Sequence, residues 1–290
     1  MSIQSKLFNR RYQPFTFLYE VISKKYIKKT SRIHIKEKPQ IAMFSFDYIS
    51  NQITLDGRYE DAILLWITEN LEKYTQDKVT LDVGANIGNH SIAFSNISKE
   101  VASFEPNRKI FHLLNINKSL KSNIKIFNYG LSDKNEILNA YVPINNFGGA
   151  SVRKKRIKVL RKELLTFELK KFDDIKNFSK LNIGLVKIDV EGNEYKVIKG
   201  MKHLLLSQSP IILFEKNDIN IENREINFLK QMGYKYFYEF TNEANWIFKN
   251  KFLQIIEGFL LGVPSNKKKA CVLTDFTKKQ ELIIASKFNI

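Results

Sequence analysis

The chain has 290 residues, enough for one large or two small domains with a substantial core. Its 47 basic and 30 acidic residues give a net charge of +17, which is typical of proteins that bind nucleic acid, anionic membranes or anionic glycans. The sequence is also rich in Lys, Asn and Ile together, and this bias raises the net charge without any such partner. The single cysteine, Cys271, excludes an intramolecular disulfide and favours a reducing cytoplasm, and no apolar run reaches the roughly 20 residues of a membrane-spanning helix.

Residues 1–40 combine basic and aromatic side chains, and the stretch 15–27 has the pattern of an amphipathic helix with a basic face. Two interpretations of this basic arm stay open. It packs on the rest of the chain, or it lies on an anionic membrane surface and holds a cytoplasmic protein there. After the arm, the pattern predicts a strand over 41–50, a hairpin partner over 53–55 and a helix over 58–74.

The stretch 79–91 reads Val-Thr-Leu-Asp-Val-Gly-Ala-Asn-Ile-Gly-Asn-His-Ser and predicts a buried strand, a tight glycine turn and the start of a helix. Such a turn binds nucleotides, because glycine lets the backbone come close to the ligand. The turn reads G-x-N-x-G, and Asn86 stands where a pyrophosphate-binding loop has its second glycine. We therefore expect a nucleoside ligand without a pyrophosphate, and S-adenosylmethionine (SAM) fits.

Two acids flank this turn. A second strand ends in Glu105, about 20 residues after the turn, where an acid accepts hydrogen bonds from both ribose hydroxyls of a nucleoside. Asp82 precedes the turn and is expected to face the amino-acid end of SAM, whose ammonium and sulfonium groups suit carboxylates. Strand-end acids also cap turns, but two of them around one glycine turn favour the nucleoside site.

A third strand, predicted over 124–129, is followed by Ser132 and Asp133. The ends of successive parallel strands line one crevice, so one of these residues is placed to bind the adenine amino group, unless the pair only forms a turn. The predicted cofactor-binding residues are Asp82, Gly84, Ala85, Asn86, Gly88, Asn89, Glu105, Pro106, Ser132 and Asp133.

Residues 134–180 interrupt the alternation of strands and helices between the third and fourth main strands. Loops beyond strand ends carry specificity, so we expect this inserted segment to bind the acceptor. Phe147 is expected to stack on a sugar ring, Gly149 to permit a close loop and Ser151 to hydrogen-bond a hydroxyl. Arg153 begins a basic run that either binds an anionic group of the acceptor or forms a solvated face.

A fourth and a fifth strand each end in acids. Asp189 and Glu191 follow the fourth strand, and Glu215 ends the fifth. Acids that converge on one crevice raise one another's proton affinity, which suits a general base, and we predict Asp189 in that role with Glu191 and Glu215 next in line. Lys187 alternates onto the same side of its strand as Asp189 and is expected to be its charge partner.

Two alternatives stay open for these acids. All three bind a divalent cation such as magnesium or manganese, although the sequence offers no recognisable metal set, or Asp189 and Glu191 cap the helix predicted over 194–201. Farther on, the pattern predicts a helix over 221–232 and a terminal antiparallel hairpin over 234–240 and 246–249. Residues 251–290 are predicted to be a tail without assignable chemistry.

Together these stretches resemble one family, the FkbM-type SAM-dependent methyltransferases. The resemblance covers about residues 50–250 and rests on 81–91, 104–107, 130–133, 148–151, 186–192 and 212–215. It implies an α/β fold with a Rossmann-like, seven-stranded class I methyltransferase sheet, in a domain over 41–250. It also implies methyl transfer from SAM to an acceptor oxygen, often a sugar hydroxyl of a surface glycan, a glycolipid headgroup or a secondary metabolite.

Two other functions are weighed against carbohydrate O-methylation in polysaccharide biosynthesis. The net charge suggests an RNA methyltransferase, but the sequence has no recognisable RNA-binding segment. A non-catalytic SAM-binding protein is the third hypothesis, and intact acids at three strand ends count against it.

Overall fold

The structure is a computed structural model that describes residues 38–45, 47–143, 162–216, 223–242, 268–273 and 280–290, with isolated positions outside these ranges. Within them, no helix is both long and apolar enough to cross a bilayer. The described helices are α3 (Tyr48–Asp56), α4 (Asp61–Thr75), α5 (Asn89–Phe94), α6 (Arg108–Asn117), α7 (Glu194–Gly200), α8 (Lys202–Ser207) and α9 (Arg224–Gln231).

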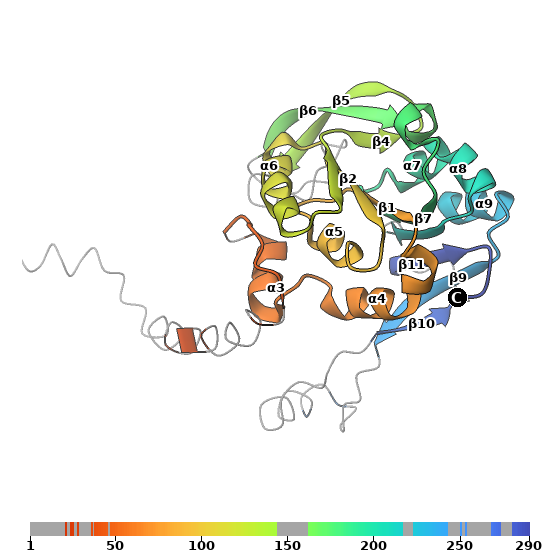
Figure 1. The fold of residues 1–290 in the computed structure, drawn as a ribbon. Coiled ribbons are helices and arrows are strands. Elements are labelled where there is room, and N and C mark those ends of the chain that lie inside the picture. Colours follow the sequence, from red (N-terminus) through yellow and green to blue (C-terminus); the bar gives the residue numbers. More distant parts are fainter. Residues whose placement is uncertain are drawn as a thin grey trace, which may run out of the picture.

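The described strands form a large central sheet and a small second sheet (Figure 1). The parallel strands of the central sheet are β1 (Val79–Val83), β2 (Glu100–Phe104), β3 (Ile124–Phe127), β7 (Ile183–Ile188) and β8 (Ile211–Lys216). Its antiparallel strands are β9 (Tyr236–Asn242), β10 (Lys268–Val272) and β11 (Gln280–Ser286). The order is β10-β9-β11-β8-β7-β1-β2-β3, and the predicted α/β class is confirmed.

The antiparallel end of the central sheet differs from the prediction. Among the described residues this sheet has eight strands in place of seven, because β10 pairs with β9 at the edge. The predicted hairpin partner of β9, over 246–249, lies outside the described residues. The sheet also takes β11 from the region where we predicted a tail. β11 contains the run Leu282-Ile283-Ile284-Ala285, buried throughout, as expected for a strand between two neighbours in a covered sheet.

Helices cover both faces of the central sheet, which explains why its parallel strands are apolar runs. On one face, Val79, Leu81 and Val83 of β1 belong to a core cluster that includes residues of α7, α8 and α9. On the other face, α4 and α5 pack in a second cluster with Leu185 of β7. In Figure 1, α7, α8 and α9 lie together at one side of the sheet and α4 and α5 at its front.

The strands predicted over 41–50 and 53–55 are wrong, since residues 48–56 form the helix α3. Its start is capped by Asp47, whose carboxylate accepts a hydrogen bond from the backbone N–H of Ile49. Its end is set by Gly57, which has a left-handed φ of 79° and donates its N–H to the carbonyl of Ile53. These caps outweigh the alternating pattern, and α3 brings Tyr48 and Ile49 to the site described below.

The inserted segment contributes most of the second sheet. β4 (Gly130–Ser132) pairs in parallel with β6 (Lys162–Lys171), and β6 pairs antiparallel with β5 (Glu136–Pro143). Buried Ala140, Val142 and Phe167 form a small apolar cluster on this sheet. In Figure 1 the second sheet lies beside the central sheet, at the top of the view. Residues of β4, β5 and β6 form one wall of the cavity described next.

Candidate active site

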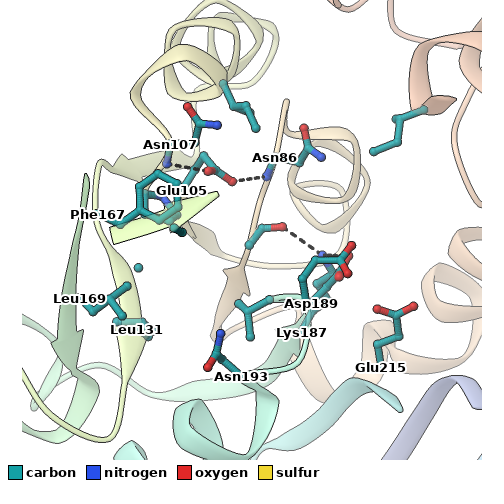
Figure 2. Close-up of a pocket in the computed structure, with 18 of the residues that line it drawn as sticks. Asn86, Glu105, Asn107, Leu131, Phe167, Leu169, Lys187, Asp189, Asn193 and Glu215 are labelled. Atoms are coloured by element: carbon teal, nitrogen blue, oxygen red, sulfur yellow. Dashed lines mark hydrogen bonds and ion pairs between the residues drawn. The ribbon is translucent and has the colours of Figure 1, made fainter. Parts of the chain in front are cut away.

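The carboxyl ends of β1, β2, β7 and β8 lie at one edge of the central sheet, because these strands run parallel. The chain order reverses at β1, which pairs with β2 on one side and β7 on the other, and open α/β sheets bind ligands outside such a reversal. A cavity of about 320 Å³ lies there (Figure 2). The predicted site residues that line it are Gly84, Asn86, Glu105, Pro106, Asp189, Glu191 and Glu215.

The glycine turn after β1 packs directly against the end of β7. Gly84 has a φ of +77°, and a Cβ at this position would lie 1.8 Å from the backbone carbonyl oxygen of Asp189. Gly88 also has a positive φ, and a Cβ there would lie 2.8 Å from the side chain of Leu114 in α6. Only glycine fits these two positions, so the turn is fixed by its contacts with β7 and α6.

Glu105 is buried at the end of β2 and is held by two backbone N–H groups. Its Oε2 accepts from Asn86 at 3.1 Å and its Oε1 from Asn107 at 2.8 Å, as Figure 2 shows. Burial raises the pKa of this carboxyl to about 7, although the two backbone hydrogen bonds and Lys187 act in the opposite direction. Each oxygen retains a lone pair for a ligand, because a carboxylate oxygen accepts two hydrogen bonds.

Lys187 is a buried cation that joins the glycine turn to the acids of β7. Its Nζ donates to the carbonyl of Gly84 at 3.2 Å and to Oδ2 of Asp189 at 3.2 Å, and lies 3.5 Å from Oδ1 of Asp82. Burial acts to lower the pKa of Lys187, but the carboxylates of Asp189, Asp82 and Glu60 raise it above its usual value. The lysine therefore stays charged, and the predicted pairing of Lys187 with Asp189 is present.

Asp82 lies behind Lys187 and has no exposed surface. Its Oδ2 accepts a hydrogen bond from the hydroxyl of Ser91 at 2.6 Å, and Ser91 accepts one from Ser103 at 2.8 Å. The structure therefore connects Asp82 to the cavity through Lys187, which lines it.

The other part of the cavity is apolar and comes largely from the second sheet. Leu131 of β4, Leu138 and Ala140 of β5, and Phe167 and Leu169 of β6 line it. Figure 2 shows Leu131, Phe167 and Leu169 on the Glu105 side, with Asp189 and Glu215 across the cavity. The cavity thus has an apolar half beside Glu105 and an acidic half beside Asp189.

Ser132 and Asp133 follow Leu131 but do not line the cavity. Asp133 accepts a hydrogen bond from Lys199 at 2.9 Å, and this bond is the main reason why the pKa of Asp133 is lowered. The hydroxyl of Ser132 is buried and has no hydrogen-bond partner among the residues that the structure describes. An adenine contact through either residue stays a prediction.

Two predicted cofactor residues shape the site without lining it. Ala85 donates its backbone N–H to the carbonyl of Phe104, which ties the turn to β2. Asn89, the first residue of α5, hydrogen-bonds both backbone groups of Tyr59. The four predicted acceptor residues Phe147, Gly149, Ser151 and Arg153 lie outside the described residues.

Comparison with known proteins identifies the family. The model of the methyltransferase FkbM domain matches residues 82–236, which include the glycine turn, Glu105 and the acids after β7 and β8. This chain belongs to the FkbM methyltransferase family. The FkbM domain thus spans β1 to the start of β9, and the resemblance inferred from the motifs is confirmed.

A curated relative and two solved structures are similar to this FkbM protein. The hexuronic acid methyltransferase AglP of Haloferax volcanii is 34% identical over 145 residues, which are 49% of this chain and 58% of AglP. The FkbM methyltransferase structure from Methylobacillus flagellatus KT has 11% identity and a TM-score of 0.41, covering 92% of this chain and 59% of that one. The precorrin-6y C5,15-methyltransferase structure from Geobacter metallireducens has 13% identity and a TM-score of 0.44, covering 85% and 93%.

The residues of the FkbM site fit SAM. Gly84, Asn86 and Glu105 line the cavity, and contact of the Glu105 carboxylate with the two ribose hydroxyls stays a prediction. Asn107 lines the same cavity, and its side-chain Nδ2 has no hydrogen-bond partner in the described part of the chain, so this amide suits a ring nitrogen of adenine. The apolar side chains of Pro106 and Leu131 suit the faces of that ring.

Glu105→Gln is expected to weaken SAM binding about 10- to 100-fold at pH 8, because a hydrogen bond to a charged group contributes about 1.5–3 kcal/mol. In the parent protein, SAM affinity is expected to rise with pH through about 7, where Glu105 loses its proton. Calorimetry across this range tests both effects, with Glu168→Gln on exposed β6 as the control. A Glu105→Gln variant that keeps the pH dependence of the parent would remove Glu105 from the site.

The raised pKa of Glu105 also makes the stability of the protein depend on pH. The folded pKa of about 7 lies above the ordinary value of 4.5, so the folded protein holds this proton more tightly than the unfolded chain. The contribution of Glu105 to the free energy of unfolding therefore falls as pH rises from 4.5 to 7. Glu105→Gln is expected to gain melting temperature relative to the parent over that window.

The structure adds cavity residues that the sequence analysis did not predict as site residues. They are Tyr48, Ile49, Tyr59, Glu60, Asn107, Ile110, Leu138, Ala140, Phe167, Leu169, Val190, Asn193 and Leu282. Six of them come from α3, β5 and β6 and reach the site through long-range packing. One signal was available: Asn89 and His90 directly follow the glycine turn, and both bind the residues between α3 and α4. Among the described residues, no three His, Cys or acidic side chains are grouped as a metal site.

Proposed function

We propose that this FkbM protein transfers a methyl group from SAM to a hydroxyl of a carbohydrate acceptor, in a surface glycan or a glycolipid headgroup. One observation carries the proposal: a single cavity joins a nucleoside-type half at Glu105 to an acidic half at Asp189. The name of the relative AglP, a hexuronic acid methyltransferase, supports a carbohydrate acceptor. Because the chain spans 58% of the length of AglP, the acceptor is part of the proposal.

When bound, SAM would supply an electrophilic methyl group. Gly84, Asn86, Glu105, Pro106 and Asn107 would hold it, through backbone, carboxylate, apolar and amide contacts. Glu105 would bind the ribose hydroxyls only in its carboxylate form.

Asp189 is proposed as the general base that takes the proton of the acceptor hydroxyl. Its side chain is 39% exposed and lines the cavity, so an acceptor can reach it. Lys187 holds its Oδ2, which leaves Oδ1 for the acceptor proton. A positioned base of this kind contributes typically about 10²–10⁴-fold to the rate. Glu191 and Glu215 line the same cavity and are next in line for this role.

A divalent cation bound by these acids is the alternative way to activate the hydroxyl. The buried ammonium of Lys187 beside Asp189 favours the metal-free route, because a cation there would be repelled by the lysine. Adding a chelator to the assay separates the two routes.

The function is tested by incubating the purified protein with methyl-labelled SAM and fractionated cell material. Label is expected in the glycan or glycolipid fraction, with a shallow dependence of the rate on salt. An RNA acceptor would give label in RNA and a steep salt dependence, because each phosphate contact releases counterions. Label in RNA alone would overturn the proposal in favour of an RNA methyltransferase, and SAM binding without label anywhere would favour a non-catalytic protein. A glycolipid acceptor would also give the basic arm over 1–40 a role at the membrane.

A further inference from the structure

Tyr59 and Glu60 connect α3 to α4 and line the same cavity as Asp189 and Glu215. They precede the glycine turn in the sequence and lie outside the match to the FkbM domain. Two polar side chains at this place can contact whatever occupies the acidic half of the cavity.

Asn89 and His90, which directly follow the glycine turn, hydrogen-bond Tyr59 and Glu60. The side-chain amide of Asn89 accepts from the backbone N–H of Tyr59 at 3.1 Å and donates to its carbonyl at 2.9 Å. The next residue, His90, donates from Nε2 to Oε2 of Glu60 at 3.0 Å. Asn89 and His90 begin α5 directly after Gly88, so the segment that shapes the nucleoside half also fixes Tyr59 and Glu60.

The backbone of Glu60 is strained. It has φ 54° and ψ 37°, in the left-handed region that a side chain with a Cβ disfavours. Among the described residues, the non-glycine residues with positive φ are Glu60, Asn86, Glu191 and Ser209, and the first three all line this cavity. Residues with strained backbone are found most often at ligand-binding and active sites, where the surrounding contacts hold them in that conformation.

Both side chains retain an atom for a ligand. Oε1 of Glu60 and the hydroxyl of Tyr59 have no hydrogen-bond partner among the described residues. Burial first, and then the charges of Glu60 and Asp189, raise the pKa of Tyr59 well above its ordinary value, so the phenol stays protonated and donates. A donor and an acceptor on consecutive residues therefore line the same cavity as Asp189.

We propose that Tyr59 and Glu60 bind the acceptor, with the Tyr59 hydroxyl donating to one oxygen of the acceptor and the Glu60 carboxylate accepting from a hydroxyl. This rests on the proposed function in one respect, that the acceptor is hydroxylated. Adjacent hydroxyls of a sugar present such a donor and acceptor together. A carboxylate of the acceptor would be repelled by Glu60, so this wall selects the uncharged, hydroxyl-bearing edge of the sugar. Asn89 and His90 are positioning residues.

The test compares Tyr59→Phe and Glu60→Gln with the parent in steady-state kinetics on the acceptor fraction that takes label. KM for the acceptor is expected to rise about 3- to 10-fold in Tyr59→Phe and 10-fold or more in Glu60→Gln, since the second loses a charged hydrogen bond. SAM affinity is expected to stay within about 2-fold. The matched controls are Tyr236→Phe on β9 and Glu168→Gln on β6, because neither Tyr236 nor Glu168 lines the cavity.

The positioning role has its own readout. His90→Ala is expected to raise KM for the acceptor at unchanged SAM affinity, and His90→Gln to restore it, because the glutamine amide can still donate to Glu60. Acceptor KM values in Tyr59→Phe and Glu60→Gln equal to those of the controls would overturn the proposal while carbohydrate methylation stands. Label in a different acceptor would overturn the proposed function. The KM for that acceptor would then be measured in Tyr59→Phe, Glu60→Gln and the controls, and a rise in the first two alone would still support binding of the acceptor by Tyr59 and Glu60. Label in no fraction would overturn both.

Discussion

Gly84→Ala is expected to abolish measurable SAM binding and to lower the melting temperature sharply. The added methyl group would lie 1.8 Å from the carbonyl oxygen of Asp189 and 2.9 Å from its carbonyl carbon. Both contacts are with backbone, which cannot swing away as the end of a long side chain does. Overpacking costs typically about 1–3 kcal/mol, and the left-handed backbone adds roughly 1–2 kcal/mol for a residue with a Cβ. Calorimetry with SAM and a thermal melt measure the two effects.

Gly233→Ala is the matched control for this substitution. Gly233 also has a left-handed backbone, with a φ of +92°, but a Cβ there would meet only the flexible end of Lys287, at 3.7 Å or more. This variant carries the backbone penalty without the clash, so it should lose roughly 1–2 kcal/mol and keep SAM binding. Equal losses in the two variants would show that β7 does not press against the turn as the structure has it.

Asp189→Asn is expected to lower kcat about 10²- to 10⁴-fold, the usual contribution of a general base, while SAM affinity changes by no more than a few-fold. Asparagine keeps the shape and can still accept the hydrogen bond of Lys187, but it cannot take a proton. Turnover and SAM binding are measured on the same preparation, and a thermal melt checks the fold.

A second aspartate–lysine pair serves as the control. Asp174 lies 3.3 Å from Lys171 on the surface, and Asp174→Asn is expected to turn over at the parent rate. If Asp189→Asn also turns over at the parent rate on the true acceptor, Asp189 is not the base. Glu191→Gln and Glu215→Gln would then identify which of the remaining acids carries the role.

The parts of the fold and site that the sequence predicts are those set by neighbouring residues. The apolar run of β1 and the glycines after it need only local rules, and Glu105 follows from its distance to that turn. The pairing of Lys187 with Asp189 follows from alternation along one strand. The glycine turn and Glu105 line one half of the cavity, and Lys187 and Asp189 line the acidic half.

Long-range contacts set what the sequence did not predict. Tyr59 is held by Asn89, which lies 30 residues away, and strand or helix periodicity does not predict a contact at that distance. Asp133 follows β4, and its side chain accepts a hydrogen bond from Lys199, which lies 66 residues later in the chain. The sequence around helix α3 alternates as a strand does, and this pattern predicted strands although Asp47 and Gly57 can cap a helix.

The position of β11 has a consequence for the order in which the chain acquires its fold during synthesis. β11 lies between β8 and β9 although it comes after both in the sequence. Until residue 286 has left the ribosome, β8 is an uncovered apolar edge and β9 and β10 have no bond to the rest of the sheet. An exposed edge of this kind invites pairing with other chains. We therefore expect the nascent chain to be most prone to wrong pairing at the end of the sheet farthest from β3.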